Sequence, residues 1–152
     1  MKAITIWQPW ASLLACGEKL FETRSWATSY RGPIAIHAAK KDVHDALILI
    51  PIPLALEMKR LIGKEWKDLP TGAVIATANL VGCHRIGRLD DHETGYWDCN
   101  RPLAWIDATA QEASFGDWTP GRFAWEFSDM KMITPIPVSG RQGLWEWKGA
   151  PG

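Results

Sequence analysis

The chain has 152 residues, a length that fits one domain and is large enough to bury most of the surface that its unfolded chain exposes. Its hydrophobic content of 47% is ordinary for a soluble globular protein and excludes disorder as a description of the whole chain. The 17 basic and 17 acidic side chains cancel, which excludes a protein that coats nucleic acid by bulk electrostatic attraction.

The charges are distributed unevenly along the chain. Residues 1–41 hold six basic and two acidic side chains, whereas residues 90–118 hold one basic and seven acidic ones. The N-terminal third is therefore the better candidate to meet an anionic or electron-rich ligand. The ten tryptophans exceed what a core of this size needs, and they can also line an aromatic pocket or form a stacking platform.

The cysteines and the apolar segments predict where the protein works. Cys16, Cys83 and Cys99 are an odd number at unrelated spacings, so we expect reduced thiols and no disulfide framework. The first residues lack the apolar core of a signal peptide, and the longest apolar stretch, residues 46–56, contains two prolines and is too short to span a bilayer. We expect a cytoplasmic protein without a membrane partner.

The N-terminal elements follow one another closely. Residues 3–7 form a β-branched strand, and Pro9 then suits the first turn of a helix that Gly17 ends. From residue 20 to 26 the pattern has a period of two, which predicts a strand with Glu22 and Arg24 on one face. A turn at residues 31–33 leads to the next predicted strand, residues 34–38.

The rest of the chain alternates helices, strands and irregular segments. We predict two helices, a strand, an irregular stretch with a short helix near residues 108–113, a bent strand or pair of strands, and a last strand. These elements lie at residues 42–50, 54–62, 73–81, 83–118, 123–133 and 144–147. About five or six strands with a few short helices predict a mainly β, α+β single domain over residues 1–152, shaped as a small, partly open barrel.

The segment from Gly17 to Arg24 is the most informative part of the sequence. Lys19 lies just beyond a helix end, and Glu22 and Arg24 share one face of the following strand. A neighbouring arginine keeps a carboxylate ionised, and a lysine beside a carboxylate and an apolar wall can have its proton affinity tuned. The same spacing is also compatible with an ordinary surface ion-pair cluster at a helix–strand junction.

Gly17, Lys19, Glu22 and Arg24 form the pattern G-x-K-x-x-E-x-R, which resembles the signature of the ASCH family. The resemblance extends over residues 4–41 and 115–147, whereas residues 42–70 and 83–114 look like family-variable inserts. The further matching segments are Ile6–Ala11, Ser25-Trp26, Tyr30–Pro33, Ile36–Ala38, Gly121–Trp125 and Pro135–Gly143.

The resemblance implies a PUA-like small mixed β-barrel with flanking short helices, a signature that lies at a cleft beside the barrel, and an action on RNA. Some small bacterial members are amidohydrolases that remove the acetyl group of N4-acetylcytidine with a lysine, a threonine and a glutamate, and ribonuclease activity has been attributed to others. Lys19 matches the lysine of these enzymes. Glu22 stands at the position of the threonine, and residues 72–81 carry Asn79 but no carboxylate. Glu22 can supply the missing carboxylate in a Lys19–Glu22 pair.

The leading prediction is a domain that binds RNA or a modified nucleoside in a cleft lined by Lys19, Glu22, Arg24 and tryptophans. Aromatic faces stack on bases, an amide reads a Watson–Crick edge, and a guanidinium meets phosphate. Core packing remains the alternative for each tryptophan, and a packed, hydrogen-bonded histidine is the alternative for His37. The expected ligand-binding residues are Trp7, Gln8, Trp10, Arg24, Trp26, Tyr30, Arg31, His37 and Asn79.

Two other functions stay open. The first is a hydrolase, acting on acylated cytidine or on RNA, with Lys19 and Glu22 as catalytic residues. The second is a non-catalytic interaction module, although the sequence identifies no protein partner. We expect no cofactor. We also expect no metal, since the zinc-type ligands Cys83, His84, His92 and Cys99 include no C-x-x-C pair.

Overall fold

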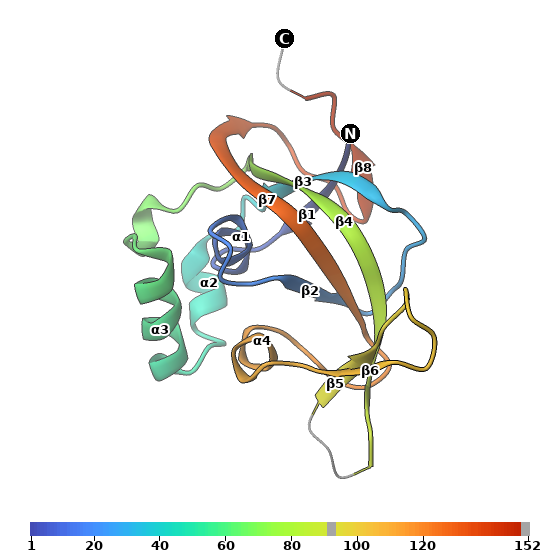
Figure 1. Cartoon of the computed structure of the whole chain (residues 1–152). Helices are drawn as coiled ribbons and strands as arrows, with labels where there is room; N and C mark the ends of the chain where they lie inside the picture. Colours follow the sequence, from blue (N-terminus) through green and yellow to red (C-terminus); the bar gives the residue numbers. More distant parts are fainter. Residues whose placement is uncertain (91–93, 150–152) are drawn as a thin grey trace. The chain divides into compact units, whose positions relative to one another are not determined.

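The computed structural model describes residues 1–90 and 94–149. The chain forms two compact units. The first unit comprises residues 1–18, 33–78 and 129–152, and the second comprises residues 19–32 and 79–128. Two long strands, β4 and β7, contribute residues to both units. They lie side by side in Figure 1, drawn in light green and orange.

The described residues form a mixed α+β fold, mostly strands with a few short helices, as predicted. No helix among them has both the length and the apolar character needed to cross a membrane. The helices are α1 (Trp10–Ala15), α2 (Val43–Leu47), α3 (Ile52–Ile62), a 3-10 helix (Trp66–Asp68) and α4 (Ala110–Phe115). The strands are β1 (Lys2–Ile6), β2 (Phe21–Arg24), β3 (Gly32–Ala38), β4 (Ala73–Arg88), β5 (Thr94–Trp97), β6 (Trp105–Asp107), β7 (Phe123–Pro137) and β8 (Leu144–Glu146).

The first unit is built around β1. This strand pairs in parallel with β3 and antiparallel with β8, so that Ala3 lies opposite both Ala35 and Trp145. These residues belong to one buried cluster, which Val74 and Trp147 complete. Trp145 and Trp147 are buried because alternate residues of a strand point to the same face.

Gln8 fixes the start of α1 in this unit. Its side-chain Oε1 accepts a hydrogen bond from the backbone N–H of Ser12 at 2.9 Å, and its Nε2 donates to the carbonyl of Pro70 at 2.8 Å. The side chain is 1% exposed, and both ends of its amide are therefore used inside the unit. Gly17, with φ of +83°, ends the helix in the left-handed conformation that glycine adopts without strain.

The second unit is built on β2 and the strands that follow it in the sheet. β2 pairs antiparallel with β7, which places Glu22 opposite Trp125, and β5 pairs antiparallel with both β4 and β6. Its core cluster consists of Ile86, Tyr96, Trp118 and Ala124, with Phe21 packed against it. Because side chains alternate along β2, Glu22 and Arg24 lie on the opposite face from Phe21.

The structure corrects the expectation for residues 83–118. That stretch was expected to be irregular, but β4 runs on to Arg88 and two further strands, β5 and β6, follow it, which brings the described strands to eight. These strands escaped sequence reading because β5 and β6 are only three or four residues long. Tyr96 of β5 belongs to the core cluster, and Ile106 of β6 packs against it. One core-facing apolar residue in a strand is too few to give a period-two pattern. The predicted short helix in this stretch is α4.

Candidate functional site

Lys19 and Arg24 both contact Glu22 in the second unit. The Lys19 Nζ atom lies 3.7 Å from Oε1 of Glu22, and the Arg24 guanidinium lies 3.1 Å from Oε2 of the same carboxylate. The Lys19 ammonium also donates a hydrogen bond to the carbonyl of Phe21. The Glu22 carboxylate therefore lies between the two cations, because β2 projects it and Arg24 from the same face.

The three side chains differ in exposure. Lys19 is 1% exposed, Glu22 12% and Arg24 26%. Burial lowers the pKa of Lys19, because an ammonium loses its hydration in the protein interior. The carboxylates of Glu22 and Glu112 oppose this fall in the Lys19 pKa, and Arg24 adds to it. The cluster thus combines a buried amine of reduced proton affinity with a partly accessible carboxylate and guanidinium.

Glu112 is a member of the site that sequence reading missed. It lies on α4 and is only 5% exposed, and its Oε2 accepts a hydrogen bond from the backbone N–H of Leu20 at 2.7 Å. Its buried Oε1 has no hydrogen-bond partner among the residues that the structure describes. Burial raises the pKa of Glu112, while the Leu20 N–H and the Lys19 ammonium pull that pKa back down.

The local sequence explains both the position of Glu112 and why it was overlooked. Thr109 caps α4, since its Oγ1 accepts a hydrogen bond from the Glu112 N–H at 3.1 Å, and the Trp118 indole donates to the Glu112 carbonyl at 2.8 Å. Thr-x-x-Glu is a capping pattern and predicts a helix start rather than a site. Only the tertiary structure brings this glutamate to Lys19, more than ninety positions away.

Trp26 forms an aromatic wall next to the motif. Its ring contacts that of Trp125 edge to face, with 4.8 Å between centroids, and the Trp125 indole donates to the Trp26 carbonyl at 3.3 Å. Trp125 is completely buried and lies opposite Glu22 in the sheet. Trp26 is thereby held beside the strands that carry the motif.

Three further predicted residues belong to the second unit. Arg31 is exposed, and its guanidinium donates to the carbonyls of Thr28 and Tyr30 at 3.0 and 2.8 Å and to Sγ of Cys99 at 3.6 Å. The Tyr30 N–H donates to Thr28 Oγ1 at 3.1 Å. Asn79 is half-buried on β4. The structure ties Arg31 to Cys99, and the roles of all three in ligand binding stay predictions.

The other four predicted residues belong to the first unit. Trp7 is 45% exposed, and the Lys41 ammonium lies 4.5 Å from the centroid of its ring. Trp10 is half-buried at the first position of α1, and Gln8 holds the start of that helix as described above. His37 is 1% exposed on β3, where its Nε2 contacts the Val138 carbonyl at 2.7 Å.

His37 makes the stability of the protein depend on pH. Burial lowers its pKa below the ordinary value of 6.5, so the folded state binds fewer protons than the unfolded state between the two pKa values. The stability from neutral His37 is fully present above about pH 6.5. It is lost as the pH falls through the lowered pKa.

We expect urea denaturation of the wild type to show a fall in the free energy of unfolding from pH 7 to pH 5. The fall should be smaller in His37→Gln. Equal falls in the two proteins would contradict the assignment.

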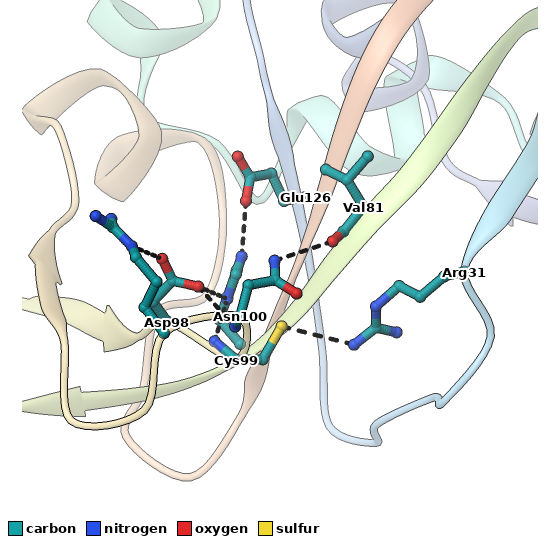
Figure 2. A network of polar contacts seen from close by, with 8 residues as sticks. Arg31, Val81, Asp98, Cys99, Asn100 and Glu126 are labelled. Atoms are coloured by element: carbon teal, nitrogen blue, oxygen red, sulfur yellow. Dashed lines mark hydrogen bonds and ion pairs between the residues drawn. The ribbon is translucent and has the colours of Figure 1, made fainter.

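His84 belongs to a second polar network, of which Figure 2 labels Glu126, Asp98, Cys99 and Asn100. The Nε2 of this buried ring contacts Glu126 Oε1 at 2.7 Å, and its Nδ1 accepts the Cys99 N–H at 3.0 Å. Asp98 accepts hydrogen bonds from the Asn100 N–H at 2.8 Å and from Arg101 at 3.0 Å, and the Asn100 amide donates to the Val81 carbonyl at 3.2 Å. The network ties the loop after β5 to β4 and β7.

The same residues contain a potential metal-ligand set. Donor atoms of His84, Asp98 and Cys99 lie within 4.8 Å of one another, whereas His92 lies outside the described residues. However, Nδ1 of His84 and both Asp98 oxygens already accept hydrogen bonds, and the cations Arg31 and Arg101 contact Cys99 and Asp98. This geometry favours a hydrogen-bonded clamp over a metal site.

Comparison with known proteins places these observations in a family. The family model of the ASCH domain matches residues 4–137, which is most of the chain and includes the whole motif. The chain belongs to the ASCH domain family. The family expected from the motif is therefore confirmed, as is the mixed α+β fold, and the bounds of the match enclose both stretches that look like inserts.

Two curated relatives share part of this ASCH domain. Human and mouse Activating signal cointegrator 1 are each 34% identical to it over 83 residues, which is 53% of this chain and 14% of each relative. The chain thus spans about one seventh of the length of these relatives. Among solved structures, the ASCH protein of Zymomonas mobilis is 16% identical, and a variant of that protein is 18% identical. Each matches with a TM-score of 0.47 over 90% of this chain and 73% of the other.

Proposed function

We propose that this ASCH domain binds RNA or a modified nucleoside through Lys19, Glu22 and Arg24. The observation that carries the proposal is the placement of one carboxylate between a buried ammonium and a partly exposed guanidinium. A rigid strand supplies two of the groups, so their geometry is set before a ligand arrives. Such preorganisation lowers the entropic cost of binding.

The chemistry of the cluster matches the edge of a base. A carboxylate has about four lone-pair sites. Lys19 and Arg24 contact one oxygen each, which leaves Glu22 able to accept N–H groups from an exocyclic amine or a ring nitrogen. Arg24, the most exposed of the three, can donate to a base carbonyl or a phosphate. Trp26 offers an aromatic surface next to them, on which a base can stack.

Glu22→Gln tests the proposal. The amide has nearly the same shape but loses the negative charge and one acceptor oxygen, so it accepts fewer N–H groups. We expect the affinity for the bound nucleoside to fall by roughly 10- to 100-fold, as for the loss of a hydrogen bond to a charged group. Isothermal titration with cytidine, N4-acetylcytidine and short oligouridylates measures the affinity. Glu57→Gln, at a half-buried helical glutamate of the first unit, is the matched control and should bind like the wild type. Equal affinities of Glu22→Gln and the wild type would overturn the proposal.

One observation favours the hydrolase as the second candidate. Burial shifts the pKa values of two groups of the site in opposite directions: it lowers the pKa of Lys19 and raises the pKa of Glu112. A lysine of reduced proton affinity can accept a proton from an attacking water, and a carboxyl of raised pKa can hold a proton for a leaving nitrogen. Hydrolysis of an N4-acylated cytidine, or of RNA, would use this pair with Glu22 beside it.

Incubation of the protein with the same ligands decides between the candidate functions. Release of cytidine from N4-acetylcytidine, followed by absorbance, would establish the amidohydrolase, and shortening of the oligouridylates would establish a ribonuclease. Binding without turnover would leave the binding domain. A folded protein that neither binds nor turns over any of these ligands would favour the non-catalytic interaction module.

A further inference from the structure

The second unit carries an indole pair that the motif does not include. Ile86, Tyr96 and Ile106 lie opposite one another on β4, β5 and β6 and pack into or against the core cluster. Because side chains alternate along a strand, the residues next to these three in the sequence point to the opposite face of the sheet. That outer face carries Arg85, Trp97 and Trp105, which are also directly opposite one another in the register.

Trp97 and Trp105 form an open corner rather than a packed core. Their rings meet at 71° with 5.2 Å between centroids, and Trp97 is 37% exposed. The Trp105 indole donates to Oδ1 of Asp107 at 2.7 Å, which fixes the orientation of that ring. The two rings are therefore steeply inclined to each other and leave an open angle between them.

Two paired glycines make room for this corner. Gly87 lies opposite Gly95, and a Cβ at Gly95 would come within 2.7 Å of the Trp105 ring and 2.3 Å of the Ile106 carbonyl. A Cβ at Gly87 would lie 3.7 Å from both indoles. The indole rings therefore pack directly against the backbone of the two glycines, which carry no Cβ.

Glu22 and Arg24 of the motif lie on the same face of the sheet as the indole pair. Ala124 of β7 belongs to the core cluster, so Trp125 points to the opposite face, where it lies opposite Glu22 and is itself completely buried. In the sheet, β7 lies between β2 and β4, and β5 follows β4. Arg31 contacts Cys99, two residues after Trp97. Arg24, Arg85 and Trp97 therefore lie on one face of the sheet, while Trp26 contacts Trp125 on that face.

We infer that the ligand of this face is a single-stranded oligonucleotide, with one nucleotide at the motif and a neighbouring unpaired base stacked in the Trp97–Trp105 corner. This inference rests on the proposed function and narrows its ligand class. Three strand spacings of about 4.8 Å separate β2 from β5, about 14 Å along the sheet, which a free nucleoside does not span. In a duplex the bases are paired and stacked on one another, so only an unpaired strand offers a base to an indole.

Trp97→Ala tests the inference by fluorescence anisotropy with labelled ten-nucleotide oligouridylate and oligothymidylate. We expect the affinity for the oligonucleotide to fall roughly 5- to 150-fold, the loss typical of one base–aromatic stack, while the affinity for the single nucleoside is unchanged. Trp97→Phe keeps an aromatic face and should restore most of the affinity. Arg85→Ala should weaken binding and flatten its salt dependence, whereas Lys131→Ala, at an exposed cation of the first unit, should do neither.

The outcomes separate this inference from the proposed function. Oligonucleotide binding that is equal in Trp97→Ala and the wild type overturns the inference, even if Glu22→Gln has lost nucleoside binding. A loss in Trp97→Ala together with unchanged nucleoside binding in Glu22→Gln overturns the proposed function and supports the stacking corner. The two labelled oligonucleotides distinguish RNA from DNA, since only RNA carries the 2′-hydroxyl.

Discussion

Replacing Lys19 with methionine is expected to weaken nucleoside binding more than tenfold while leaving the free energy of unfolding within about 1 kcal/mol of the wild type. Methionine fills a similar volume without a charge, and its burial avoids the desolvation penalty of the ammonium, about several kcal/mol, which offsets the lost attraction to Glu22. Arg24 still neutralises Glu22 after the change. The Phe21 carbonyl loses its hydrogen bond, at a cost of about 1–3 kcal/mol, which offsets the gain from removing the charge.

The loss of binding follows from what Lys19 does for Glu22. The ammonium holds one oxygen of the carboxylate, and without it that oxygen is no longer fixed in place. Titration calorimetry and urea denaturation on the same preparations separate the two effects. A Lys19→Met protein that binds like the wild type, or one that is destabilised by 3 kcal/mol or more, would show that the ammonium acts only as a structural ion.

The pH dependence of stability provides an independent check on Lys19. Because burial lowers its pKa, the unfolded state binds more protons than the folded state between the lowered value and the ordinary value of about 10.5. The free energy of unfolding therefore gains a contribution that rises with pH in that window. Lys19→Met should lack this rise, so the wild type should gain stability relative to the variant as the pH increases.

Replacing Trp125 with alanine is expected to cost about 3–5 kcal/mol of stability, the largest single loss that we expect in the second unit. Trp125 is completely buried and is the largest fully buried side chain of the described residues. Its removal leaves a cavity under Trp26 and breaks the hydrogen bond to the Trp26 carbonyl. A domain of ordinary stability has only about 5–15 kcal/mol to lose.

Urea denaturation measures the effect, with Trp97→Ala as the matched control. Trp97 is partly exposed, so the control should lose roughly 1 kcal/mol or less. If the two tryptophan variants were equally stable, Trp125 could not be the residue that supports the motif strands. If Trp125→Ala stays folded at low temperature, it should also bind nucleosides more weakly, because Trp26 loses the ring that holds it.

The sequence by itself determined the family, the main elements and the central residues of the candidate site. Lys19, Glu22 and Arg24 are close along the chain, and the period of a strand is enough to place two of them on one face. Helix ends at Gly17 and Gly63 were also readable, because a left-handed residue favours glycine. Local geometry dictates such features, so local sequence reveals them.

What only the tertiary structure decided depends on distant contacts. Glu112 binds the Leu20 N–H, next to Lys19, because α4 folds back onto the start of β2, and nothing in its capping sequence indicates that contact. The Trp97–Trp105 corner depends on the register that sets Gly87 against Gly95 and clears the surface beneath the rings. Gln8, expected at a ligand, is instead committed to Ser12 and Pro70, because a buried amide must find partners for both its ends. Pairings of this kind arise from packing between remote segments, which no window of the sequence contains.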